Sequence, residues 1–246
     1  MRTLVDLHNH LLPGIDDGAP DLATAISLAQ LAVEDGITHM VCTPHIHPGR
    51  YDNTQATIAT ALSQFKQGLT ERGINLKVSA AAEVRFGMEL MEWAVTGQLP
   101  FVGEYQGKNV LLLEFPHGEI PFGAEKLIKW LISKEITPMI AHPERNKGIM
   151  AKPSKLKPFL QLGCLTQVTA QSITGGFGSA CQEIAHKFLA EEKITIIASD
   201  AHNIQHRPPK IADAFGVIET LTNKQQADQI AANAAEIANI HFSQAA

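Results

Sequence analysis

Short apolar runs recur along this chain and alternate with segments whose apolar residues follow a helical spacing. Runs of this length, bounded by turn residues, are typical of buried strands. They predict seven strands, at Thr3–His8, Ile37–Thr43, Leu76–Glu83, Asn109–Phe115, Thr137–His142, Cys164–Thr169 and Ile194–Ser199. Because helical patterns separate the strands, a parallel sheet covered by helices is expected.

The first helical segment shows the spacing clearly, with Leu22, Ile26, Ala29 and Val33 on the face that would cover the sheet. Later helices are predicted at Phe122–Lys134, Ser179–Glu192, Pro209–Leu221 and, rich in alanine, Asn223–Ala235. The role of the last of these is left open, and the simplest interpretation is that it caps the barrel that the strands form.

Glycines stand at the positions where the predicted helices should end. Gly36, Gly73 and Gly163 each stand just before a strand, where a helix C-terminus takes a residue that tolerates positive φ. Seven βα units predict an α/β fold, a distorted TIM-like (βα)7 barrel. Residues 1–246 could form two small domains, but barrels of this size are commonly single domains, and no linker or repeat interrupts the chain.

The composition limits the classes of protein to which this chain can belong. Hydrophobic residues make up 45% of the chain, enough for one large core, and the net charge of -5 argues against a nucleic-acid surface. Three cysteines without a framework spacing suit a reducing compartment. The first residues lack a signal-peptide layout, and no apolar stretch approaches about 20 residues. A cytoplasmic enzyme without membrane insertion is expected.

Nine candidate nitrogen and oxygen ligands for metals occur in the sequence; most follow predicted strands, and Asp17 is the least certain member. They are His8, His10, Asp17, His45, Glu83, Glu114, His142, Asp200 and His202. The carboxyl ends of parallel strands meet on one face of a barrel, which is where such enzymes place their active sites. A mixed set this large can hold two or three divalent ions, which generate hydroxide at neutral pH. The pattern predicts a metallohydrolase.

Each motif also has a simpler interpretation. His8 and His10 point to the same side of an extended chain, but a single HxH pair is a weak signal. Asp16-Asp17-Gly18 could be only an acidic turn before a helix. Asp16 is the weaker ligand candidate of the two aspartates.

The two glutamates end apolar strands, where an unpaired buried carboxylate is costly. A metal ion would remove that cost at Glu83 and Glu114. The alternative is a salt bridge to Arg85 or Arg145.

Three arginines follow ligand candidates closely along the chain. Guanidinium groups offer paired donors to phosphate oxygens, so Arg145 and Arg207 are predicted to hold a phosphate and Arg50 to contact the substrate. The alternative is ion pairing with local carboxylates, such as Arg50 with Asp52.

Other histidines fall into two groups. His47, His117 and His206 lie in loops on the predicted active-site side, and His47 and His206 are candidates for substrate binding or proton donation. His39 is interpreted as structural, and His186 and His241 as solvent-facing.

A thiol mechanism is excluded by spacing. Cysteine-dependent phosphatases place an arginine six positions after the nucleophile. Those positions here hold Pro48, Ala170 and Lys187.

Taken in order, the motifs DLHNH, TPH, AAEV, LLLEF, IAHPERN and SDAHN followed by RPP resemble the PHP superfamily, named for polymerase and histidinol phosphatase domains. The HxHxxxxxDDG opening, the HPERN box and the SDAHNxxxRPP ending are similar to bacterial capsule-type tyrosine-protein phosphatases. The resemblance covers about residues 1 to 215.

This resemblance implies a distorted PHP-type barrel with a trinuclear centre, often manganese-dependent, for which iron and zinc are the alternatives. The nine candidates would bind the metal, and Arg145 and Arg207 would hold the phosphate. A metal-activated hydroxide would hydrolyse phosphotyrosine on an autophosphorylating, membrane-associated tyrosine kinase that controls capsular or exopolysaccharide synthesis. Two alternatives stay open: a small-molecule phosphatase of the histidinol-phosphatase type, and a non-catalytic, metal-stabilised module that binds a kinase.

Overall fold

The computed structural model describes residues 2–243, whose strands lie in two sheets. The smaller sheet has the order β1 (Leu4–Asp6), β2 (Ile37–Cys42), β4 (Lys77–Ala80). The larger has the order β10 (Ile196–Ala198), β9 (Leu165–Thr169), β8 (Ile136–Ala141), β7 (Lys108–Glu114), β5 (Glu83–Arg85), β3 (His45–Ile46). Neighbours in both sheets are parallel; β6 (Gly103–Tyr105) pairs antiparallel with β7.

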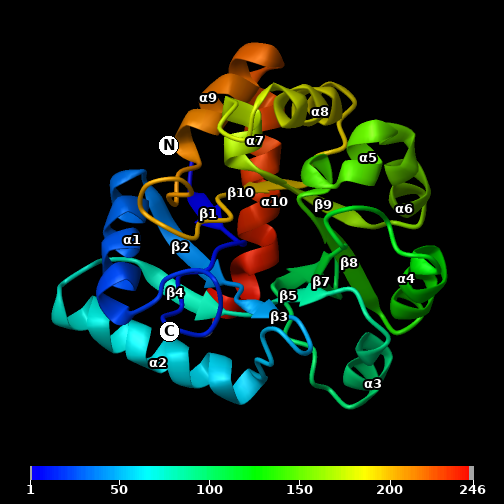
Figure 1. The fold of residues 1–246 in the computed structure, drawn as a ribbon. Helices are drawn as coiled ribbons and strands as arrows, with labels where there is room; N and C mark the ends of the chain where they lie inside the picture. Colours follow the sequence, from blue (N-terminus) through cyan, green and yellow to red (C-terminus); the bar gives the residue numbers. More distant parts are fainter. Residues whose placement is uncertain (1, 244–246) are drawn as a thin grey trace.

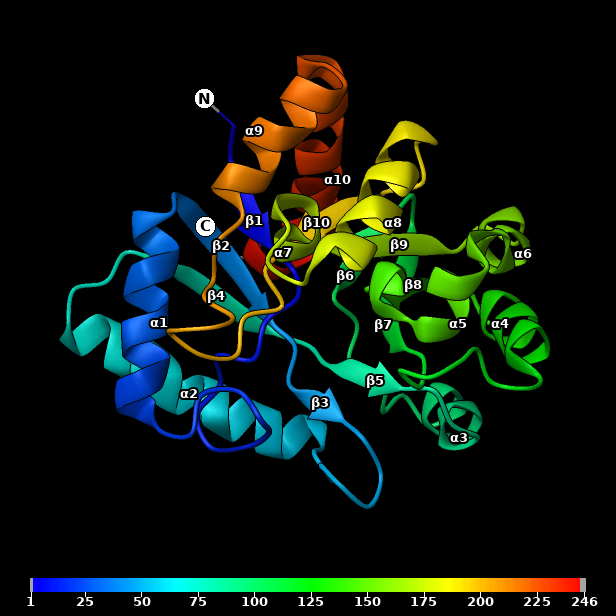
Figure 2. The ribbon, with the colours of Figure 1, turned by 45° about the horizontal axis from the view of Figure 1, so that its top comes forward.

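The two sheets join into one ring, which Figure 2 shows with β1, β2 and β4 on one side and β7, β8 and β9 on the other. The chain passes directly from β2 into β3 and from β4 into β5. On the other side, Asn9 bridges Ala201 in parallel, and the His10 amide donates to the Ala201 carbonyl at 2.8 Å. These links confirm the expected distorted barrel.

One predicted strand is interrupted in the structure, and another is followed after a break by a short strand that was not predicted. The run Leu76–Glu83 divides into β4 and β5, and the run Ile37–Thr43 ends at Cys42 before the chain resumes as β3. Pro44 lies at the second break, where it has no N–H to donate to a ladder. The break moves the ends of these strands from the smaller sheet to the larger one.

Helices surround the ring, as Figure 1 shows. They are α1 (Leu22–Glu34), α2 (Gln55–Glu71), α3 (Glu89–Val95), α4 (Ala124–Ile132), α5 (Lys147–Ala151), α6 (Lys157–Gln161), α7 (Ala170–Thr174), α8 (Ser179–Ala190), α9 (Ala212–Leu221) and α10 (Lys224–Phe242), with 3-10 turns at Pro143–Arg145 and Pro153–Leu156. Asp21 caps α1 by accepting from the Thr24 amide at 2.8 Å. Val33 lies outside the buried face that was predicted for α1, with 38% of its surface exposed.

The Ala-rich helix α10 covers one opening of the barrel and extends to Phe242, beyond its predicted end. Its Ala234, Ile237 and Ala238 pack against the apolar side chains inside the ring, among them Val5 and Val110. The helix therefore closes this end of the barrel.

Backbone contact brings α10 especially close to β6. A Cβ on Gly103 would lie 1.8 Å from the carbonyl oxygen of Ile237, and the φ of Gly103 is +151°. Only glycine fits this approach.

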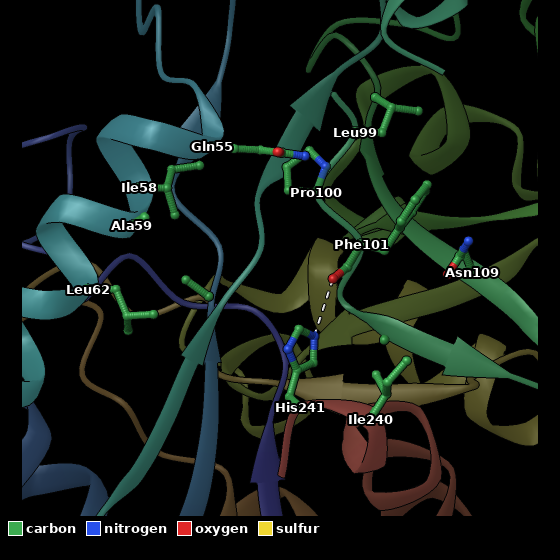
Figure 3. A pocket seen from close by; sticks show the side chains of 12 residues that line it. Gln55, Ile58, Ala59, Leu62, Leu99, Pro100, Phe101, Asn109, Ile240 and His241 are labelled. Carbon is green, nitrogen blue, oxygen red and sulfur yellow. Dashed lines mark hydrogen bonds between the residues drawn. The ribbon is translucent and has the colours of Figure 1, made fainter. Parts of the chain in front are cut away.

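A cavity of about 400 Å³ lies where β4 separates from β6, between α2 and the C-terminal end of α10 (Figure 3). His241 lines it and bridges the gap: its ring contacts Ser79 Oγ at 2.9 Å and donates from Nε2 to the Phe101 carbonyl at 3.3 Å. The interpretation of His241 as solvent-facing is wrong. His186 is likewise half-buried, with its Nε2 2.9 Å from the Ile173 carbonyl.

Candidate metal centre

All nine predicted ligands meet at the carboxyl ends of the strands. They form four overlapping groups whose ligand atoms lie within 4.8 Å of one another: His10, Asp17, His45 and His202; His8, His10 and Asp200; His8, Glu83 and His142; His45, Glu83 and Glu114. The donors are imidazole nitrogens and carboxylate oxygens, a set that suits several divalent ions.

Glu83 lies at the centre of this cluster. Its Oε2 is 3.2 Å from His8 Nε2, 3.4 Å from His10 Nε2 and 3.0 Å from His45 Nδ1, and its Oε1 is 2.8 Å from His142 Nε2. Four imidazoles therefore face one carboxylate that is 1% exposed.

Two atoms of this group, Glu83 Oε2 and His45 Nδ1, are buried and lie 3.0 Å apart, but neither makes a hydrogen bond of acceptable geometry. Buried polar atoms are normally satisfied, so each such exception needs an explanation. A cation bound between Glu83 Oε2 and His45 Nδ1 would satisfy both. The residues present therefore fit a metal ion.

Asp200 connects the histidines with the arginines. Its Oδ1 lies 3.4 Å from the Nε2 atoms of both His8 and His10, while its Oδ2 accepts from Arg145 and Arg207. Burial raises the pKa of Asp200, but the facing charges of His8 and the two arginines outweigh it and hold that pKa well below the usual range. The carboxylate is therefore kept ionised, as a metal ligand must be.

Asp17 lies at the more open side of the cluster. Its Oδ1 is 3.3 Å from His45 Nε2 and 3.5 Å from His202 Nε2, and 40% of its side chain is exposed. Gly18 allows this turn to approach His10, because a Cβ there would lie 1.9 Å from the His10 carbonyl oxygen. The Asp-Asp-Gly turn is thus part of the site.

Glu114 has two kinds of neighbour. Its Oε1 forms a 2.9 Å ion pair with Arg85, the alternative considered from the sequence. Its carboxylate also belongs to the group with His45 and Glu83. No arginine forms an ion pair with Glu83 within residues 2–243.

The sequence analysis identified only some of the residues that contact the other ring nitrogen of the candidate histidine ligands. Asp16 Oδ2 lies 2.7 Å from His10 Nδ1, so this aspartate orients a candidate ligand. Gln167 Oε1 lies 2.8 Å from His8 Nδ1. Sequence reasoning missed Gln167, because the predicted strand that carries it has no ligand at its end.

Two candidate ligands have left-handed backbone conformations. The φ of His142 is +32° and that of Asp200 is +51°. Such conformations are uncommon for residues other than glycine and cost on the order of 1 kcal/mol or more each. They turn the side chains at the ends of β8 and β10 toward the cluster.

Arg145 and Arg207 lie side by side at the edge of the cluster, and both pair with Asp200 as the ion-pair alternative foresaw. Phe177 packs against both: its ring centroid is 4.5 Å from Arg145 Cζ and 5.8 Å from Arg207 Cζ. Phe177 was missed, although it stands out as a partly buried aromatic residue in the glycine-rich run TGGFG.

His47 and Arg50 lie in the turn after β3. Burial, and next the charges of Arg85 and Arg50, lower the pKa of half-buried His47. The exposed Arg50 lies over the ring of Tyr51, 5.0 Å from its centroid, and Tyr51 stacks on His45 at 5.5 Å. No Arg50–Asp52 ion pair occurs in the described part of the chain; Asp52 accepts instead from the Gly49 amide at 2.7 Å.

The backbone of the exposed residue His206 is held by two hydrogen bonds. Gln171 Nε2 donates to its carbonyl at 3.0 Å, and its amide donates to Asn203 Oδ1 at 2.7 Å. Its imidazole makes no hydrogen bond within residues 2–243, so the structure does not bring this side chain into the cluster.

The cysteines lie outside all four metal-type groups. Cys42 and Cys164 are buried, and burial raises the pKa of the Cys164 thiol to about 12. Burial also raises the pKa of half-buried Cys181. Such thiols are poor nucleophiles at neutral pH.

Among the described residues, no helix is long and apolar enough to span a bilayer.

Two tyrosine-protein phosphatases are similar to this chain over most of its length. The tyrosine-protein phosphatase YwqE of Bacillus subtilis is 35% identical over 216 residues, which cover 88% of this chain and 84% of that protein. The tyrosine-protein phosphatase CpsB of Streptococcus agalactiae is 25% identical over 245 residues, covering 97% of this chain and all of that protein.

Solved structures agree. A chain from the crystal structures of YwqE from Bacillus subtilis and CpsB from Streptococcus pneumoniae, described as unique metal-dependent tyrosine phosphatases, superposes with a TM-score of 0.90 at 33% identity, over 96% of this chain and 94% of that one. An organophosphorus hydrolase from Deinococcus radiodurans, at 13% identity and a TM-score of 0.55, shares the fold.

The family described as "Capsular polysaccharide synthesis, CpsB/CapC" matches residues 4–239. Because that match spans nearly the whole chain and agrees with both comparisons, this protein belongs to the CpsB/CapC family.

Proposed function

We propose that this chain is a metal-dependent protein-tyrosine phosphatase. Its substrate would be phosphotyrosine on an autophosphorylating kinase that controls capsular or exopolysaccharide synthesis. The observation that carries the proposal is the cluster around Glu83, where buried Glu83 Oε2 and His45 Nδ1 lack hydrogen-bond partners beside two arginines.

The four ligand groups would hold two or three divalent ions. His8, Glu83 and His142 would hold one, and the group around Asp17 another. Manganese is the favoured metal; iron and zinc are compatible with the same donors. When bound, the ions supply a hydroxide nucleophile at neutral pH and neutralise charge on the phosphate.

Arg145 and Arg207 would bind the non-bridging oxygens of the phosphate. A guanidinium has five N–H donors, so each arginine can keep its bond to Asp200 and still offer donors to the substrate. These donors would stabilise the charge that develops on the phosphoryl group.

Residues at the rim would contact the rest of the substrate. Arg50, His47 and His206 are candidates, and an imidazole there could protonate the leaving group. Because a phenolate leaves more easily than an alkoxide, this proton matters less for phosphotyrosine than for an alkyl phosphate.

The partner would be a membrane-associated bacterial tyrosine kinase, reached from the cytoplasm. The family name supports a role in capsular polysaccharide synthesis, and the names of the relatives support a phosphotyrosine-bearing protein as the substrate.

One experiment separates the candidate functions. The protein is stripped with a chelator, reloaded with manganese, and given a phosphotyrosine peptide and histidinol phosphate side by side. We expect metal-dependent phosphate release that is much faster from the peptide. A preference for histidinol phosphate would indicate a small-molecule phosphatase, and release from neither would support a non-catalytic kinase-binding module.

Two variants control the experiment. His142→Ala removes a ligand from the Glu83 group and should abolish release. His186→Ala makes the same change on α8, outside all four groups, and should retain activity.

A further inference from the structure

Gln167 is a polar residue where the barrel interior is otherwise apolar. It lies on β9, between Ala141 of β8 and Ile196 of β10 in the strand register, and both neighbours belong to the apolar cluster inside the ring. Its side chain is fully buried, and its Nε2 has no hydrogen-bond partner. A buried amide with an unsatisfied donor costs about 1 to 3 kcal/mol, so packing alone does not explain it.

The carbonyl oxygen of this amide contacts two candidate ligands. Gln167 Oε1 lies 2.8 Å from His8 Nδ1 and accepts the backbone N–H of His142 at 3.1 Å. These two histidines belong to one metal-type group, with Glu83. Although β9 carries no ligand at its own end, it supports ligands on β1 and β8.

For His8, the contact sets the tautomer. An amide oxygen can only accept, so Nδ1 must carry the proton and donate it. When the ring is neutral, as a metal ligand must be, the lone pair then lies on Nε2, the atom that faces Glu83 Oε2 at 3.2 Å and Asp200 Oδ1 at 3.4 Å. Hydrogen bonds of this kind orient metal-binding imidazoles in proteins generally.

For His142, the contact supports an unfavourable backbone. His142 has a φ of +32° at the point where the chain leaves β8 for the 3-10 turn Pro143–Arg145. The bond from its amide to Gln167 holds that conformation and points the imidazole at Glu83 Oε1, 2.8 Å away.

We propose that Gln167 is a positioning residue that orients His8 and His142 together for one metal ion. The inference rests on the proposed function, because it assumes that these histidines are ligands. On this proposal, one amide side chain orients two of the three residues, His8, Glu83 and His142, that would hold the ion.

The test is manganese binding to the chelator-stripped protein, measured by titration and elemental analysis without any assay of activity. Gln167→Leu keeps most of the volume and removes the acceptor. We expect the affinity for one ion to fall roughly 10- to 100-fold, the range typical of lost supporting contacts. Gln167→Glu restores the acceptor and should bind within a few-fold of the wild type.

Two controls separate positioning from a general structural role. Gln226→Leu makes the same change at a half-buried glutamine on α10, whose Nε2 donates to the Leu189 carbonyl, and should leave manganese affinity unchanged. Thermal unfolding of the metal-free proteins should show that Gln167→Leu still unfolds in one cooperative transition, with at most a modest loss of stability, because leucine suits the apolar interior but leaves His8 Nδ1 and the His142 amide without their acceptor.

The outcomes are distinct. Wild-type affinity in Gln167→Leu would overturn the proposal and leave the proposed function standing. Equal loss of manganese affinity in the leucine and glutamate variants, or a metal-free leucine variant that no longer unfolds in one cooperative transition, would overturn it in favour of a packing role. A wild-type protein that binds none of manganese, iron and zinc would overturn both.

Discussion

The guanidinium of Arg145 donates to Oδ2 of Asp200, whose other carboxylate oxygen faces the histidine cluster. A candidate phosphate-binding residue is therefore fixed directly to a candidate metal ligand. Arg207 donates to the same oxygen, and Phe177 lies against both arginines. The candidate phosphate site and the candidate metal site therefore meet at this one carboxylate.

Replacing Arg145 with lysine should separate the two roles. Lysine keeps the charge beside Asp200 but loses the planar set of donors that a phosphate can share. We expect kcat/KM for a phosphotyrosine peptide to fall on the order of 10²-fold, as for the loss of one stabilising donor, with manganese content unchanged. Loss of manganese in parallel with activity would instead mean that Arg145 serves mainly to hold Asp200.

Phe177 should affect substrate binding more than turnover. Its ring holds both guanidinium groups, and a cation–π contact contributes about 0.5 to 2 kcal/mol. Phe177→Leu should therefore weaken competitive inhibition by inorganic phosphate by about 2- to 30-fold, while Phe177→Tyr should retain it. Phe122→Leu, at a fully exposed phenylalanine, is the matched control. Unchanged inhibition in Phe177→Leu would contradict the role of the ring.

Thiol reagents should leave the enzyme active. Burial raises the pKa of Cys164 to about 12 and raises that of Cys181, so little thiolate exists at neutral pH. Treatment with iodoacetamide at pH 7.5, followed by assay with manganese, should give unchanged turnover, and Cys181→Ser should do the same. Stoichiometric inactivation that substrate prevents would point to a catalytic thiol.

His241 should contribute to stability in a pH-dependent way. Its ring joins Ser79 on β4 to the Phe101 carbonyl across the gap between the sheets, and burial lowers its pKa. Because the folded protein disfavours the protonated ring, this contribution is present above the unfolded pKa of about 6.5 and is lost as the pH falls through the lower folded value.

His241→Gln should therefore reduce the free energy of unfolding by about 1 kcal/mol at pH 8 and by less at pH 5. Urea unfolding of the metal-free proteins measures the difference. His206→Gln, at an exposed ring, should show no such trend. A stability cost of His241→Gln that grows as the pH falls would contradict this role of His241.

The sequence predicted the ring of strands and the residues at its carboxyl end because both depend on a regular local pattern. An apolar run followed by His8, Glu83 or Asp200 is visible without a partner strand. Parallel topology then brings the strand ends together, as the structure has it. That these residues bind metal stays a prediction until a titration is made.

The remaining features depend on contacts between distant segments. Gln167 looks like any polar residue in a strand until β8 and β10 enclose it, and the partner of His241 lies 162 residues away along the chain. The breaks between β2 and β3 and between β4 and β5 were not predicted, because apolar residues continue through the second of them. In the sequence, only the glycines around Phe177 distinguish it from other aromatic residues.

The left-handed backbones of His142 and Asp200 have a consequence for protein engineering. A search for stabilising substitutions would select glycine or asparagine at both positions, since these residues tolerate positive φ. Each such choice would relieve local strain and delete a candidate ligand at the same time. Selection for thermal tolerance alone would thus drive this barrel toward an inert scaffold, so libraries built on it should hold residues 142 and 200 constant.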